Sequence, residues 1–117
     1  MTEFRDFSFR DNSVAGAYDD VLVPVLFEPW AVGLVEDYGQ WETMCVLDLA
    51  TGTGVVARLL AERVGPKGKV IGADINSEML TLAKDRCAGV TQAVHFIESP
   101  AHPLEISDGA VDVVVCQ

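Results

Sequence analysis

The stretch of sequence that decides the fold is VLDLATGTGVVA, residues 46–57. It begins with a short apolar run that contains the acid Asp48, continues into a turn with Gly52 and Gly54, and ends in an apolar pattern of helical spacing. Such a stretch predicts a buried strand, a tight turn and a helix. Because glycine has no Cβ, the turn can lie directly against a ligand, and the acid before it indicates what charge that ligand carries.

The rest of the chain alternates between helical and strand patterns. Between residues 13 and 38 apolar residues recur at helical spacing, but Pro24 and Pro29 interrupt the pattern, so two or three short helices are expected. Further on, short apolar runs bounded by turn residues predict strands, and amphipathic stretches between them predict helices. The expected strands are 44–49, 69–74, 94–97 and 111–116, and the expected helices between them are 55–64 and 76–87.

This alternation is typical of the α/β class, and we expect a Rossmann-like, doubly wound parallel sheet with N-terminal helices. Right-handed crossovers place the second and third strands on one side of the first, and the fourth strand then lies on the other side. The expected strand order is therefore 3-2-1-4, with a ligand bound outside the carboxyl ends of the strands. Residues 13–117 are expected to form this single domain, and the polar residues 1–12 a flexible arm.

The strand expected at 111–116 is followed only by Gln117. A core strand with no partner beyond it would leave an apolar sheet edge open, and native domains avoid such edges. The sequence therefore predicts a domain truncated after its fourth strand, with the remainder of the sheet missing. The same open edge gives the chain a route to self-association.

The composition limits the classes of partner that this chain can have. Eight Lys and Arg against eighteen Asp and Glu give a formal charge of −10, which repels phosphate backbones and argues against nucleic acid. No apolar run approaches the roughly 20 residues of a membrane span, and no signal peptide is evident, so a cytoplasmic protein without a membrane partner is expected. Three cysteines without a Cys-x-x-Cys pair are expected to be buried, reduced thiols, and no metal site is expected at His95 or His102.

The segment 52–57 also fits the dinucleotide pattern G-x-G-x-x-A, so the charges near it have to separate two kinds of ligand. Asp48 would repel the pyrophosphate of a dinucleotide, whereas it favours the sulfonium and ammonium groups of S-adenosylmethionine. Asp74, at the end of the second strand, can accept hydrogen bonds from a ribose diol of either ligand. Simpler explanations stay open: the glycines could only make a tight turn, and either acid could only cap a helix.

Three segments resemble motifs of the class I S-adenosylmethionine-dependent methyltransferases. Residues 46–54 are similar to the first motif, residues 70–80 to the acidic second motif, and residues 107–117 to the segment that enters the fourth strand. Tyr18 and the helices after it resemble the leading helices of the small-molecule branch, such as the quinone-biosynthesis methyltransferases. The resemblance covers most of residues 14–117. It implies S-adenosylmethionine as cofactor and a small molecule as methyl acceptor.

The resemblance also implies roles for single residues near the glycine turn. Asp48, together with the backbone of Ala50, Gly52 and Gly54, would hold the methionine part of the cofactor. Asp74 would hold the ribose hydroxyls. These residues form the expected centre of the cofactor site.

The adenine would lie farther along the chain. By resemblance, Ile75 and Met79 would pack on it, and Ala101 would lie beside its amino group, although core packing is the simpler explanation for the first two. The family often has an acid just before this alanine, but the present chain has Pro100, which offers neither a carboxylate nor an N–H. Recognition of the amino group is therefore expected to depend on Ser99 or on backbone groups.

Two residues are expected near the reacting groups. By resemblance, Gln117 would lie near the transferable methyl group, and Tyr18 would line a lid over the pocket, unless it only packs between helices. No catalytic residue can be named, because the family's substrate-facing residues mostly lie beyond the fourth strand. The chain is thus expected to be the cofactor-binding half of a methyltransferase, inactive by itself. The alternatives are a dinucleotide-dependent oxidoreductase and a non-catalytic binding or dimerisation module.

Overall fold

The computed structural model describes residues 16–117 except residues 17 and 91, so the arm expected at residues 1–12 lies outside the described part. One parallel sheet contains all four strands: β1 (Cys45–Leu49), β2 (Lys69–Asp74), β3 (Val94–Glu98) and β4 (Val113–Cys116). The strand order is β3-β2-β1-β4, which confirms the predicted order and gives β1 a neighbour on each side.

Four helices precede the sheet or connect its first three strands: the π-helix η1 (Tyr18–Phe27), α2 (Glu28–Tyr38), α3 (Val55–Ala61) and α4 (Ser77–Arg86). The break expected at Pro29 is confirmed, because Pro29 lies in the first turn of α2. The break expected at Pro24 is wrong, because Pro24 lies inside η1, where the wider π-helix accommodates it. Gly39, with a φ of 68°, ends this helix. Helix α3 ends at Ala61 rather than at residue 64, but Val64 remains buried, and this explains why its spacing fitted a helix.

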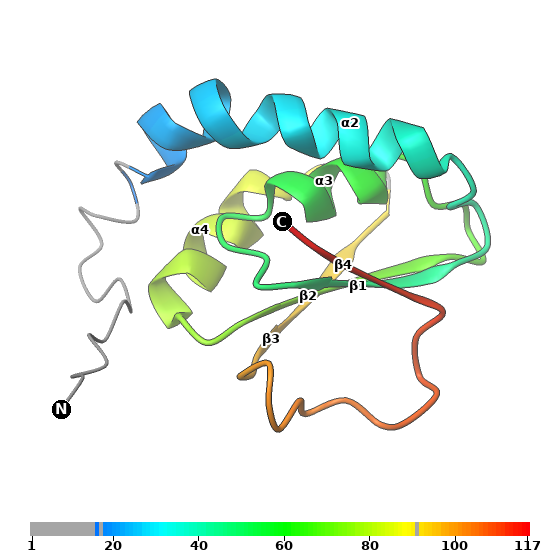
Figure 1. Ribbon diagram of the computed structural model, residues 1–117. Coiled ribbons are helices and arrows are strands. Elements are labelled where there is room, and N and C mark those ends of the chain that lie inside the picture. The colour runs from blue at the N-terminus through cyan, green and yellow to red at the C-terminus, as the bar shows by residue number, and fades with distance from the viewer. Residues whose placement is uncertain (1–15, 17, 91) are drawn as a thin grey trace, which may run out of the picture.

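The helices all cover one face of the sheet. In Figure 1, α3 and α4 lie against the sheet, η1 and α2 cross above α3, and the connection from β3 to β4 passes over the opposite face. The core under the helices consists of Ala31, Val35, Trp41, Val46, Val56, Ala57, Leu60, Ala61, Val64, Val70 and Val115. The core on the other face consists of Leu47, Ile71 and Ala73, against which Leu104, Ile106 and Val111 of the connection pack.

The parallel sheet brings several chain segments together at one edge. The carboxyl ends of parallel strands meet at the same edge, so the residues that follow β1 and β2 and the end of β4 are neighbours there. In this register Asp48 lies beside Gly72 of β2 and Val115 of β4. A Cβ at position 72 would come within 2.7 Å of the Phe96 ring and 3.0 Å of the Thr51 hydroxyl, so glycine is required next to Asp48.

The three cysteines are free thiols, but they are not all buried. Cys87 is buried, whereas Cys45 is partly exposed and Cys116 is exposed. The expectation of a buried thiol is therefore wrong for Cys116, because the outward face of β4, where Val114 also lies, has no cover among the described residues. Within the part of the chain that the structure describes, no helix has the length and apolar character to cross a membrane.

Candidate cofactor site

The turn between β1 and α3 has an unusual backbone conformation. Ala50, Gly52 and Gly54 have φ angles of 57°, 58° and 85°, in the left-handed region. This conformation is costly for Ala50, which has a Cβ, and such residues persist only where the surroundings hold them in place. Here the amide of Thr51 donates to the carbonyl of Ala73 in β2 at 2.8 Å. The predicted glycine turn is thus held to the neighbouring strand by a backbone hydrogen bond.

Asp48 lies under this turn and is almost fully buried, with 2% of its surface exposed. The hydroxyl of Thr51 donates to Oδ2 of Asp48 at 2.7 Å. The pKa of Asp48 is raised to about 7, chiefly by burial and to a smaller extent by nearby Asp74, against the lowering effects of Thr51 and of the Ala57 backbone. No described Lys, Arg or His forms an ion pair with this carboxyl group. A cationic group placed beside it would therefore favour its ionised form.

Asp74, at the end of β2, is partly buried and joins two loops. Its Oδ2 accepts a hydrogen bond from the amide of Gly52 at 2.9 Å, and its Oδ1 accepts one from the amide of Asn76 at 2.9 Å. Each carboxylate oxygen can accept a second hydrogen bond, so a ribose diol would still find acceptors there. The side chain that caps α4 is Asn76, which accepts from the Met79 amide at 3.1 Å, so Asp74 is not the cap of that helix.

A small cavity of about 20 Å³ adjoins Asp48. The structure brings three of the predicted site residues, Asp48, Ala50 and Gln117, together in its wall. The wall also contains Phe27, the last residue of η1, whose carbonyl accepts a hydrogen bond from Nε2 of Gln117 at 2.9 Å. The sequence pattern indicated where α2 begins but not that the preceding residue faces the sheet edge, and Phe27 was missed for this reason. The remaining lining residues are Thr51, Val55 and Val56.

The residues predicted to surround the adenine are not gathered in the same way. Ile75 follows β2 and is 66% exposed. Met79 lies in the interior, where only 3% of its surface is exposed. The burial of Met79 agrees with the alternative that it is a core residue. Ala101 is exposed. Tyr18 begins η1, and its side chain lies outside the described part of the chain.

Ser99 has its polar atom already engaged in its own loop. The Ser99 hydroxyl donates to the carbonyl of Pro100 at 2.9 Å and accepts from the amide of Glu105 at 3.0 Å. The side chain is buried, with 2% exposed. These bonds shape the loop after β3, whose first amide, that of Ser99, donates to the carbonyl of Asp74. A direct role of the Ser99 hydroxyl at the adenine stays a prediction.

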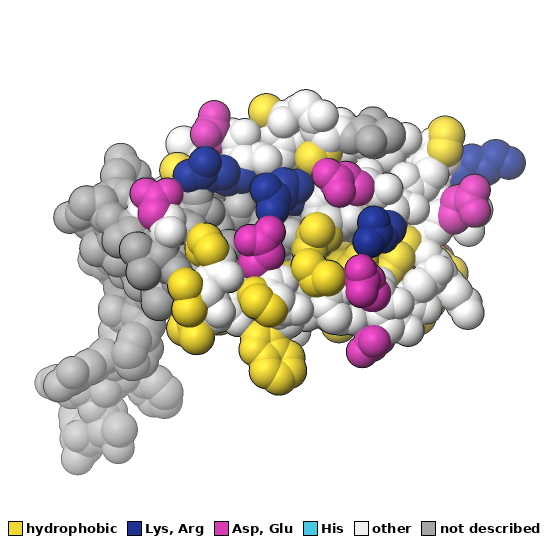
Figure 2. Space-filling view, turned by 90° about the horizontal axis from the view of Figure 1, so that it is seen from above, with side chains coloured by type: hydrophobic (Ala, Val, Ile, Leu, Met, Phe, Trp, Pro, Cys, Tyr) yellow, Lys and Arg dark blue, Asp and Glu magenta, His cyan; other side chains and the backbone are white. Residues whose placement is uncertain are grey.

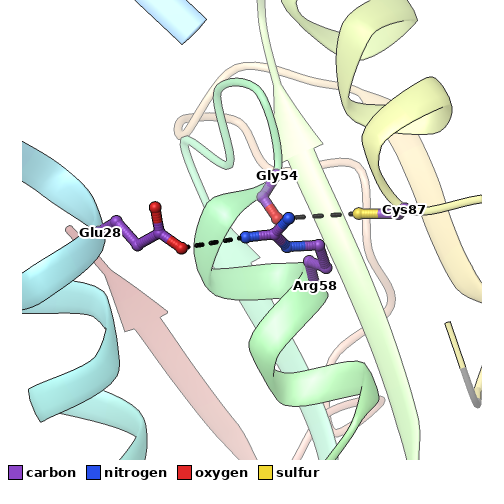
Figure 3. Close-up of polar contacts among 4 residues, drawn as sticks. All are labelled: Glu28, Gly54, Arg58 and Cys87. Atoms are coloured by element: carbon purple, nitrogen blue, oxygen red, sulfur yellow. Dashed lines mark hydrogen bonds and ion pairs between the residues drawn. The ribbon is translucent and has the colours of Figure 1, made fainter. Parts of the chain in front are cut away.

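Two side chains that the sequence patterns did not point to lie behind the turn (Figure 3). The thiol of Cys87 donates to the carbonyl of Gly54 at 3.7 Å, and burial raises the pKa of this thiol to about 11, so it stays protonated. On the adjoining side, Arg58 of α3 forms an ion pair with Glu28 of α2 at 3.3 Å. A Cβ on Gly54 would lie 3.1 Å from the Cys87 sulfur and 3.2 Å from the Cβ of Ala83.

Residues 46–117 match a family model described as a methyltransferase domain. The ubiquinone/menaquinone biosynthesis C-methyltransferase UbiE of Ectopseudomonas mendocina is 41% identical over 108 residues, which cover 88% of this chain and 42% of that protein. The protein of the same name from Pseudomonas savastanoi pv. phaseolicola is 37% identical, with the same coverage. This chain therefore spans less than half the length of these curated relatives.

Solved structures with the same arrangement include a SAM-dependent methyltransferase from Aquifex aeolicus, with a TM-score of 0.73 and 30% identity over 91% of this chain and 56% of that one. The YcgJ protein from Bacillus subtilis gives a TM-score of 0.64 and 27% identity over 74% of this chain and 37% of that one. With a family model that matches most of its length, this chain belongs to the class I S-adenosylmethionine-dependent methyltransferase domains.

Proposed function

We propose that this chain carries the S-adenosylmethionine-binding part of a methyltransferase that methylates a small molecule. The observation that carries the proposal is the buried carboxyl group of Asp48 under the glycine turn, which has no cationic partner among the described residues. Asp74 lies on the neighbouring strand with spare acceptor capacity. The relatives are C-methyltransferases of ubiquinone and menaquinone biosynthesis, which supports a quinone-type ring carbon as the acceptor.

The charges at the site support this cofactor over a dinucleotide. A diphosphate next to Asp48 would place like charges together in a region of low dielectric constant, which is unfavourable. The sulfonium and ammonium groups of S-adenosylmethionine would instead stabilise the ionised carboxyl group. The pattern G-x-G-x-x-A at residues 52–57 also suggested a dinucleotide-dependent oxidoreductase, but the match to a methyltransferase domain explains the same glycines. A non-catalytic role would need self-association through the outer edge of β4, and light scattering tests this, since a monomer at high concentration would exclude it.

Each of the predicted site residues has a proposed role. When bound, the cofactor supplies an electrophilic methyl group. Asp48 and the backbone of the turn would bind its charged amino-acid end, and Asp74 its ribose. Ile75, Met79, Ser99 and Ala101 are proposed for the adenine side, and Gln117 and Tyr18 for the methyl side. In this proposal the chain contributes mainly alignment of the methyl group with the acceptor atom.

The extent of the protein limits what this chain does alone. The curated relatives are more than twice as long as the segment that matches them, because the match covers 42% of their length. By resemblance, the residues that face the acceptor lie beyond the fourth strand. We therefore propose that residues 13–117 form a cofactor-binding domain that is inactive by itself. We also propose that this domain acts in the cytoplasm.

Calorimetry with S-adenosylhomocysteine tests the proposal directly. The folded chain should bind this ligand, and it should bind NADH weakly or not at all. Asp74→Asn should raise the Kd for S-adenosylhomocysteine at least about tenfold, because hydrogen bonds to a charged acceptor are the stronger kind. Asp85→Asn, which removes an exposed acid from α4, is the matched control and should leave the Kd unchanged.

The folded state of each variant is checked by circular dichroism before titration. A folded wild-type chain that fails to bind S-adenosylhomocysteine, or that binds NADH more tightly, would overturn the proposed cofactor. Equal Kd values for wild type and Asp74→Asn would remove Asp74 from the site.

A further inference from the structure

Two of the ion pairs that the described residues form between the N-terminal helices and the sheet layer lie beside the glycine turn. Arg58 of α3 contacts Glu28 of α2, and Arg86 of α4 contacts Asp20 of η1, each at 3.3 Å. All four residues line a cavity of about 260 Å³ between the two layers, together with Thr53 at the turn. Figure 2, seen from the side of these helices, shows basic side chains beside acidic ones rather than a patch of one sign. The cavity is therefore bridged by ion pairs and is not a free anion site.

Arg58 differs from Arg86 because it also belongs to the turn. Its backbone amide donates to the carbonyl of Gly54 at 2.8 Å, at the point where the turn becomes α3. Its guanidinium group reaches in the other direction, to the first residue of α2 (Figure 3). One residue thus joins the glycine turn to the helix that crosses above it.

The partner of Arg58, Glu28, directly follows Phe27, which lines the cavity next to Asp48. That cavity of about 20 Å³ has room for about one water molecule, whereas the amino-acid end of a cofactor needs more space. A shift of Phe27, which forms part of the cavity wall, would change the space beside Asp48. On its other side, the carbonyl of Phe27 is held by Gln117 at 2.9 Å.

We propose that Arg58 is a positioning residue for the cofactor: its pairing with Glu28 sets how Phe27 lies over the carboxyl end of β1. This inference rests on the proposed function, because it assumes that the cofactor binds beside Asp48. Arg58 itself does not touch the cofactor in this scheme, and it acts through the backbone at Phe27 and Gly54. Affinity should then depend on the ion pair even though its two side chains are 37% and 40% exposed.

The chain contains a matched control pair. Arg63, just after α3, contacts Glu36 of α2 at 3.9 Å, so it connects the same two parts of the structure. This pair lies toward the other end of α2 and lines neither the cavity beside Asp48 nor the larger one. Removing it should loosen the attachment of α2 without changing the position of Phe27.

The experiment compares Arg58→Met with Arg63→Met, since methionine keeps an unbranched side chain and helix propensity while it removes the charge. Arg58→Met should raise the Kd for S-adenosylhomocysteine about fivefold, near the upper range for exposed ion pairs. Arg63→Met and the charge-conserving Arg58→Lys should stay within about twofold of wild type. Glu28→Gln combined with Arg58→Met should bind no more weakly than Arg58→Met alone, because both changes break one interaction.

Amide hydrogen exchange of the ligand-free chain gives a second readout that does not depend on the cofactor. Arg58→Met should speed exchange in residues 24–31 and 50–58, and Arg63→Met should not. Equal effects of the two substitutions on Kd or on these exchange rates would overturn the proposal. If the wild-type chain binds no S-adenosylhomocysteine, the proposed function fails, and the exchange rates alone decide whether Arg58 holds the turn and the start of α2.

Discussion

The two ends of the proposed cofactor pocket differ in how far the chain alone organises them. At the methionine end, Asp48 and Ala50 line one cavity beneath a turn that is hydrogen bonded to β2. At the adenine end, Ile75 is exposed, Met79 is buried and Ser99 is bonded within its own loop. Most of the methionine end comes from one continuous strand, turn and helix, to which Phe27 and Gln117 are added, whereas the adenine end needs loops from two strands. A continuous segment thus builds its part of a site more completely than separate loops do.

The largest expected effect concerns Asp48 and the pH dependence of stability. Burial raises its pKa from 3.8 to about 7, so between these values the folded state holds a proton that the unfolded state has lost. The stability that this proton contributes is full below the unfolded pKa and is lost as the pH rises through about 7, by up to about 4 kcal/mol. Urea unfolding of Asp48→Asn should lack this loss. The free energy of unfolding of wild type relative to Asp48→Asn should therefore fall as the pH rises from about 5 to about 8.

Cofactor binding should also depend on the ionisation of Asp48, but in the opposite direction: it should strengthen as the pH rises, whereas the stability falls. Below about pH 7 a cationic ligand would have to release the proton of Asp48, so its Kd should rise up to about tenfold per unit of decreasing pH. In Asp48→Asn this part of the pH dependence should be absent, and Asp85→Asn serves as the control. A constant stability difference between wild type and Asp48→Asn from about pH 5 to about pH 8 would contradict the raised pKa.

A smaller effect should distinguish the two apolar residues at the adenine end. Met79→Ala should reduce the free energy of unfolding by about 3 kcal/mol, because it leaves a cavity in the interior. Ile75→Ala should change it by less than about 0.5 kcal/mol, because this side chain is 66% exposed. If Ile75 covers the adenine, its removal should still weaken S-adenosylhomocysteine binding. An unchanged Kd for Ile75→Ala would leave the adenine end without its proposed apolar contact.

The smallest expected effect comes from adding a methyl group at Gly54, and it reports how tightly the methionine end is packed. Gly54→Ala should reduce the free energy of unfolding by about 2 kcal/mol, because it adds left-handed strain and a close contact with Cys87 and Ala83. Gly89→Ala is the matched control, since Gly89 has a φ of 82° but nothing within 4 Å of an added Cβ, and it should lose about 1 kcal/mol. Urea unfolding gives both values. Equal losses would mean that strain alone, without packing, keeps glycine at position 54.

The sequence was enough to place the acidic and glycine residues of the candidate site on their strands and turn, because their spacing is local. Asp48, Gly52 and Gly54 lie in one segment, and the rules for strands, turns and helices act over such distances. Asp74 followed from the same reasoning on the next strand, and the strand order followed from the handedness of crossovers. Met79 shows where this reasoning stops: its helical spacing fitted both a ligand contact and a core position, and its burial in the structure agrees with the core position.

By itself, the sequence determined the alternating α/β architecture, the sheet order and the acid-flanked turn, since these depend on periodicity, chain chirality and residue type. Only the tertiary structure decided that Phe27 lines the cavity beside Asp48, that the Gln117 side chain donates to the Phe27 carbonyl, and that Arg58 pairs with Glu28. These contacts join residues far apart in the chain. They depend on how the N-terminal helices lie on the sheet layer, and no local pattern specifies that packing.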